Sequence, residues 1–105
     1  MTRTEAFDRD TQIKKELGEG WEMELLLLPD ISNVSATWTK GRCHLSCSLY
    51  DSTVFHFTIT LAVGIFIVAT GKDLKVIRDN VVNKAKQRVF ELQNALDRAV
   101  VNAYS

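Results

Sequence analysis

Apolar and small polar side chains alternate through the middle of this chain. Val34, Ala36 and Trp38 alternate with Ser and Thr, and residues 45–49 repeat the pattern. A period of two is typical of a β-strand that buries one face in a core. The formal charges of residues 31–70 are Lys40, Arg42 and Asp51. Because a sheet face left in water usually collects Lys, Glu and Arg, we expect something to cover the outer face of this sheet.

Turn residues divide the region into five strands of a predicted antiparallel meander. The first strand is expected over residues 21–28 and the second over about 33–39. Turns are expected at residues 40–41, 51–53 and 62–64, and each of these segments contains Gly, Asp or Ser, which favour chain reversal.

The turns also predict how the strands pair. A two-residue turn at 40–41 places Trp38 opposite Cys43, so that core side chains face core side chains. The next turn pairs Tyr50 with Val54. The side chains expected in the core from the last three strands are Cys43, Leu45, Cys47, Leu49, Phe55, Phe57, Ile59, Leu61, Ile65, Ile67 and Ala69.

Helical periodicity flanks the predicted sheet. A short helix is expected over residues 4–17 and ends at Gly18. A second helix is expected over residues 73–103, with Thr70 and Asp73 at the spacing of a capping box. Its apolar stripe is Leu74, Ile77, Val81, Ala85, Val89, Leu92, Leu96, Ala99 and Ala103. This helix would be about 45 Å long, whereas five strands span only about 20 Å, so we expect it to cross the sheet diagonally, to overhang it, or both.

These elements predict a single α+β domain over residues 1–105. It has two layers, in which a short N-terminal helix precedes a five-stranded antiparallel meander and a long C-terminal helix packs on one sheet face. With 46% apolar and 25% charged residues, the composition excludes a disordered chain. The N-terminus lacks the apolar segment of a secretory signal, so we expect a cytoplasmic protein. The size and build are typical of small proteins encoded by phages and mobile elements, an analogy that carries no function.

The two cysteines and two histidines do not have the pattern of a metal site. Cys43 and Cys47 are four residues apart on one strand, about 13 Å, which is too far for a disulfide. His44 points to the opposite sheet face from both thiols, and this does not fit the ligand sets of zinc sites. We therefore expect no metal and no cofactor.

Ser48 and His56 are the residues that most resemble a catalytic pair. In the predicted register they face each other on neighbouring strands, as a nucleophile and its base would. Neither an orienting carboxylate nor oxyanion donors accompany them, and His44 and His56 would lie more than about 10 Å apart. We therefore expect no catalytic residue and a protein that is not an enzyme.

The outer sheet face has the composition of an interface core, with a hydroxyl-rich centre and apolar margins. The candidate partner-binding residues on it are Leu26, Leu28, His44, Ser46, Ser48, His56, Thr58, Phe66 and Val68. The alternative is that the first helix covers this face. On the long helix, Val76, Phe90 and Val101 lie opposite the main stripe and form a second candidate surface. We expect an adaptor or inhibitor that forms a homodimer, binds another protein and makes no membrane contact.

Two other functions compete with this interpretation. Residues 72–88 hold six basic and two acidic residues, which indicates a possible nucleic-acid surface. Its candidate residues are Lys72, Lys75, Lys84 and Lys86. An ordinary solvated face explains these charges as well, and so does pairing of Arg78 and Arg88 with the acidic first helix. The second competitor is a ligand-binding or catalytic pocket between sheet and helix, with Trp38, Cys43 and Phe57 as its residues.

Overall fold

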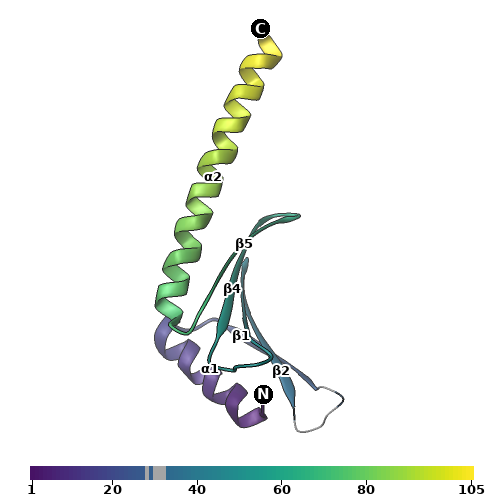
Figure 1. The fold of residues 1–105 in the computed structure, drawn as a ribbon, viewed down its shortest axis with the longest axis vertical. Coiled ribbons are helices and arrows are strands. Elements are labelled where there is room, and N and C mark those ends of the chain that lie inside the picture. The colour runs from purple at the N-terminus through teal and green to yellow at the C-terminus, as the bar shows by residue number, and fades with distance from the viewer. Residues whose placement is uncertain (28, 30–32) are drawn as a thin grey trace.

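The chain forms an α+β fold of two layers, a sheet and a pair of helices (Figure 1). The computed structural model describes residues 1–27, 29 and 33–105. The elements are α1 (Arg3–Leu17), β1 (Glu22–Leu27), β2 (Val34–Lys40), β3 (Cys43–Cys47), β4 (Phe55–Ala62), β5 (Ile65–Gly71) and α2 (Leu74–Tyr104). The sheet order is β1-β2-β3-β4-β5 with every neighbouring pair antiparallel. The predicted meander and its two flanking helices are therefore confirmed.

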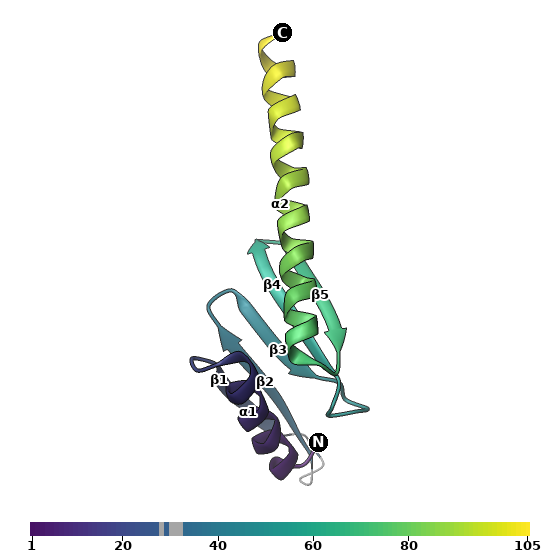
Figure 2. The same ribbon diagram turned by 90° about the vertical axis from the view of Figure 1, so that its left-hand side faces the viewer.

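Both helices pack on the same face of the sheet. Helix α1 contacts β2, and α2 contacts β4 and β5, so that the helices lie side by side over one layer (Figure 2). The core between the layers is built on one row of paired residues that crosses all five strands. That row is Met23, Trp38, Leu45, Phe57 and Ala69. Trp38 and Leu45 are completely buried, which confirms the core face assigned to these strands.

Trp38 is joined to α1 through its indole nitrogen. Trp38 Nε1 donates a hydrogen bond to Asp10 Oδ1 at 3.0 Å, and Asp10 also forms an ion pair with Lys14 at 3.1 Å. A buried indole N–H needs such an acceptor. The helix itself begins with a capping box, in which Thr2 and Glu5 exchange side-chain and backbone hydrogen bonds.

The predicted register is wrong by two residues at the second and third hairpins. The first of these turns is formed by Gly41 and Arg42, with Gly41 at a φ of 58°. Trp38 therefore pairs with Leu45 and not with Cys43. The β3–β4 pairing is displaced by the same amount, so that His56 faces Ser46. Because side chains alternate with a period of two, this shift leaves the paired residues of these strands on their predicted faces and changes only their neighbours.

Leu49 is not a core residue, contrary to prediction. Strand β3 ends at Cys47, and the Leu49 side chain is 77% exposed. The loop after β3 is held by Asp51, whose carboxylate accepts hydrogen bonds from the backbone N–H and the hydroxyl of Thr53. The Thr53 bonds, led by the hydroxyl, lower the pKa of Asp51. These local bonds replace the ladder that would have kept Leu49 in a strand.

The predicted capping box at Thr70 is wrong, because helix α2 begins about one turn later. Its N-cap is Asp73, which accepts from the N–H groups of Lys75 and Val76. Thr70 lies in β5. Gly71 ends that strand where α2 approaches it closely: a Cβ at this position would lie 2.7 Å from Cγ2 of Ile77, so only glycine fits without a shift.

The long helix extends far beyond the sheet, as its length predicted. Its buried residues are Leu74, Ile77, Val81 and Ala85. After Ala85 the helix leaves the sheet and projects away from it (Figure 1), and the molecule reaches 63 Å along its longest axis. The same apolar stripe continues into the projecting part, where Val89 is 53% exposed and Leu96 is 56% exposed. These residues belong to the stripe predicted for the helix, and they lie outside the core because the helix diverges from the sheet in this part.

Asp10→Ala is expected to destabilise the fold by about 1–3 kcal/mol, because it leaves the buried indole N–H of Trp38 without its acceptor. Asp10→Asn keeps an acceptor for the indole N–H and is expected to destabilise the fold less than Asp10→Ala does. Lys14→Ala removes only the ion pair with Asp10, which is partly exposed on its lysine side and worth about 1 kcal/mol. Urea unfolding of the three variants measures these differences. Equal losses for Asp10→Ala and Lys14→Ala would show that the indole bond contributes nothing.

Candidate interaction surfaces

The outer sheet face lies opposite both helices. Because α1 packs on the inner face beside α2, the alternative that it covers the outer face is wrong. Two neighbouring rows form the centre of this face. One row is Glu24, Thr37, Ser46, His56 and Thr70, and the next is Glu22, Thr39, His44, Thr58 and Val68. The structure thus brings together five of the predicted contact residues, and it adds two carboxylates at the β1 edge.

The remaining predicted residues lie at the margins of this face. Leu26, opposite Ser35, is 64% exposed, and Phe66, opposite Thr60, is 59% exposed. Ser48 follows the end of β3 and donates its N–H to the carbonyl of Val54. Leu28 lies outside the described residues. The apolar margins are therefore present on both sides of the hydroxyl centre.

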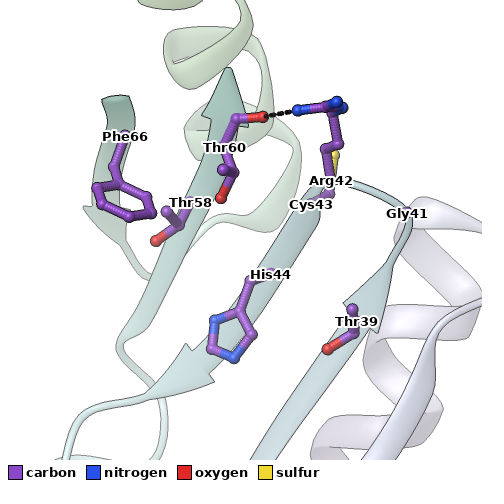
Figure 3. A pocket seen from close by; sticks show the side chains of 8 residues that line it. All are labelled: Thr39, Gly41, Arg42, Cys43, His44, Thr58, Thr60 and Phe66. Carbon is purple, nitrogen blue, oxygen red and sulfur yellow. Dashed lines mark hydrogen bonds between the residues drawn. The ribbon is translucent and has the colours of Figure 1, made fainter. Parts of the chain in front are cut away.

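A hollow of about 480 Å³ lies on this face near the β2–β3 turn (Figure 3). Its lining residues are Thr39, Gly41, Arg42, Cys43, His44, Thr58, Thr60 and Phe66. The Arg42 guanidinium donates to the carbonyl oxygens of Thr60 and Leu61, at 3.4 and 3.2 Å, which fixes the charge at the rim. An imidazole, three threonine hydroxyls and one aromatic ring make this hollow suited to hydrogen-bonded contact with a partner.

The histidines do not take the positions predicted for them. In the observed register His44 and His56 are diagonal neighbours, about 7–8 Å apart, and not more than 10 Å. His56 pairs with Ser46, and its Nδ1 lies 3.0 Å from the Thr70 hydroxyl. The Ser48–His56 pair considered as a nucleophile and base is therefore not formed.

The projecting half of α2 and the tip of the β4–β5 hairpin enclose an apolar groove. The groove has a volume of about 300 Å³, and its lining residues are Leu61, Ala62, Ile65, Val89, Leu92, Gln93 and Leu96. Sequence reasoning missed it because it placed Leu61 and Ile65 in the core. The available signal was the mismatch between helix and sheet lengths, which requires the two to separate at one end. On the back of α2, Val76, Phe90 and Val101 are 52, 62 and 66% exposed.

Two of the four candidate nucleic-acid-binding lysines contact neighbouring segments of the chain. Lys72 pairs with Asp51 at 3.6 Å, and Lys84 Nζ donates to the carbonyl of Val68 at 3.4 Å. Lys75 and Lys86 are exposed. These contacts draw two of the four predicted residues toward the sheet, so a continuous phosphate-binding row is less well supported. Nucleic-acid binding stays a prediction.

Arg78 and Arg88 do not take their ion-pair partners from α1, contrary to one interpretation of the charge distribution. Arg78 pairs with Asp79 at 3.1 Å and Arg88 with Glu91 at 3.6 Å, both within α2. The Glu5 carboxylate of α1 instead accepts from the Ser52 hydroxyl at 2.6 Å. That bond is the main reason that the pKa of Glu5 is lowered.

The space proposed for an internal pocket is filled by side chains. Trp38 and Phe57 are 0 and 3% exposed, and Leu45 pairs with both of them. Trp21 packs edge-on against Phe57 with the ring centroids 5.6 Å apart. The ligand-pocket hypothesis therefore has little geometric support.

Neither a metal cluster nor a membrane-spanning helix is found in the part of the chain that the structure describes. No group of three or more His, Cys, Asp or Glu side chains there could hold an ion. Within the same residues, no helix is both long and apolar enough to cross a bilayer. Cys43 and Cys47 are free thiols, and burial raises the pKa of Cys47 to about 11.

Comparison with known proteins gives no relative. No family model, no curated protein and no solved structure matches this chain. Its function therefore has to be argued from its own surfaces.

Cys47 is expected to react with thiol reagents at pH 8 about 10-fold more slowly than an ordinary free cysteine, because its raised pKa leaves little thiolate, and the greater nucleophilicity of the more basic thiolate offsets only part of that loss. The Cys43→Ser variant isolates this thiol, and Cys47→Ala isolates the other. Stopped-flow labelling with a disulfide reagent measures both rates, and the same variants in urea give the unfolded reference. Equal rates in the folded and unfolded chain would contradict this expectation.

Proposed function

We propose that this chain is a non-enzymatic interaction protein that forms a homodimer through α2 and binds another macromolecule on its outer sheet face. The observation that carries the proposal is the projecting half of α2. It keeps a core-type apolar stripe over about 27 Å of helix at 1.5 Å per residue, and Val89 and Leu96 in that stripe remain more than half exposed beside the β4–β5 hairpin.

The dimer follows from the cost of exposing this stripe to water. Burial contributes about 25 cal/mol for each Å² of apolar surface, and isolated helices of this length are marginal in water. Val89, Leu92 and Leu96 are 53, 38 and 56% exposed. Contact with a second copy would bury them and stabilise the helix beyond the sheet.

The outer sheet face supports the second part of the proposal. It is broad, and its centre carries hydroxyls and imidazoles that make directional hydrogen bonds. Its margins at Leu26 and Phe66 are apolar and more than half exposed, as is common where a partner is bound. The carboxylates of Glu22 and Glu24 at one edge would favour a partner with basic residues there.

Leu96→Glu is expected to convert the dimer into a monomer, with a rise in the dissociation constant of at least about 100-fold, because each interface would bury a carboxylate in place of an apolar side chain. Val101→Glu makes the same chemical change on the back of α2. Size-exclusion chromatography with light scattering measures the mass of each variant.

The two variants also identify the contacting face. Loss of the dimer with Leu96→Glu alone assigns the main stripe, and loss with Val101→Glu alone assigns the back face of Val76, Phe90 and Val101. A wild-type chain that runs as a monomer at tens of micromolar would contradict the dimer.

Thr58→Lys is expected to abolish capture of the natural partner, because it places a long charged side chain at the centre of the outer face. Thr11→Lys, on exposed α1, is the matched control. Pull-down from native-host extract with quantitative mass spectrometry compares both variants with the wild type. A partner retained equally by Thr58→Lys would exclude this face as its binding surface.

A further inference from the structure

We propose that the α2 helices of two copies pair in antiparallel orientation, so that the C-terminal turns of each helix occupy the groove beside the β4–β5 hairpin of the other. This inference rests on the proposed homodimer and specifies its geometry. The occupant of the groove is thus a second copy of this chain.

The first support is the spacing of the stripe after it leaves the sheet. Its residues fall into two series at intervals of seven, separated by alternating steps of four and three. One series is Ala85, Leu92 and Ala99, and the other is Val89, Leu96 and Ala103. This is the a/d pattern of a two-helix seam. It begins at the last residue that the sheet buries and continues along the wall of the groove.

The second support is the fit of side-chain sizes. In antiparallel pairing Leu92 meets Leu96 of the partner subunit, and Val89 meets its Ala99. The large side chains meet at the centre and the small ones at both ends. Small residues at the ends are required there, because the partner helix must enter a groove already narrowed by the hairpin. Parallel pairing would instead bring both hairpins to the same level of the helix pair.

The third support is charge. Residues 72–88 hold six basic and two acidic residues, whereas residues 89–105 hold one basic residue, Arg98, and two acidic residues, Glu91 and Asp97. In the antiparallel register above, Lys84, Lys86 and Arg88 face positions 100–105 of the partner subunit, which carry no charged side chain, so the two basic halves are kept apart. Parallel pairing would align the two basic halves, and like charges at close range are destabilising.

The fourth support is the length of the seam. The a/d pattern covers fewer than three heptads, whereas coiled coils are usually recognised over three to four. Two such helices alone would pair weakly. The hairpin residues Leu61 and Ile65 add apolar surface to the same contact, and only a helix that enters the groove can use it.

Cysteine cross-linking tests the orientation. In a Cys43→Ala, Cys47→Ala background, Val89→Cys and Ala99→Cys chains are oxidised singly and as an unfolded-and-refolded mixture. Positions 89 and 99 are separated by about 15 Å along one helix. The expected result is a disulfide-linked dimer in the mixture and none from either variant alone. A dimer from each variant alone would show parallel pairing and overturn the inference.

A second mixture tests the groove. Ala62→Cys, at the hairpin, is mixed with Ala99→Cys and treated with a short thiol-to-thiol cross-linker. Cross-linked dimers are expected. If the 89–99 pair links and the 62–99 pair does not, the helices are antiparallel and the assignment of the groove is overturned.

Light scattering on the same background separates the two proposals. A dimer that forms none of these cross-links keeps the proposed homodimer and overturns this arrangement of α2. A monomeric chain overturns both.

Discussion

The packing of Trp38 is the interaction on which the rest of the structure depends. Its side chain lies at the second position of a buried row that crosses all five strands, and its indole N–H is satisfied by Asp10 of α1. Sheet and first helix are therefore joined at one buried point by both apolar contact and a directional bond. Because this arrangement holds α1 on the inner face, the outer face stays open.

Much of this fold could be predicted from the sequence, because strand faces depend only on alternation. The two-residue register error left Trp38, Leu45 and Phe57 in the core. Neighbours across strands were not predictable in the same way, since the turn at Gly41 and Arg42 sets them, and so the relation of the two histidines was wrong. The role of Asp10 could not be predicted, because its hydrogen-bond partner Trp38 is 28 residues away. Leu49 was misplaced because the alternation of apolar and polar residues continues beyond Cys47, where strand β3 ends and the loop held by Asp51 follows.

The predictions about the surfaces were also correct where they depended on strand alternation and incomplete where they depended on how the elements are placed. The residues predicted on the outer face do share that face, because strand alternation alone decides it; that they contact a partner stays a prediction. The groove beside α2 was not predicted, because it depends on where a straight helix separates from a twisted sheet. One uninterrupted stripe serves two purposes: up to Ala85 it is core, and beyond Ala85 it is exposed. Periodicity cannot distinguish these parts, since the side chains are of the same kind in both.

The position of the tryptophans has a consequence for how unfolding of this protein is observed. The chain has two, Trp21 and Trp38, and both are buried in the core. Their fluorescence reports only on that core, whereas far-ultraviolet circular dichroism is dominated by helix, most of it in α2. If the projecting half of α2 frays first, the two signals will change at different temperatures. Such a difference is usually taken as a sign of a folding intermediate. Here it would show that the projecting end of α2 unfolds separately from the sheet and the core.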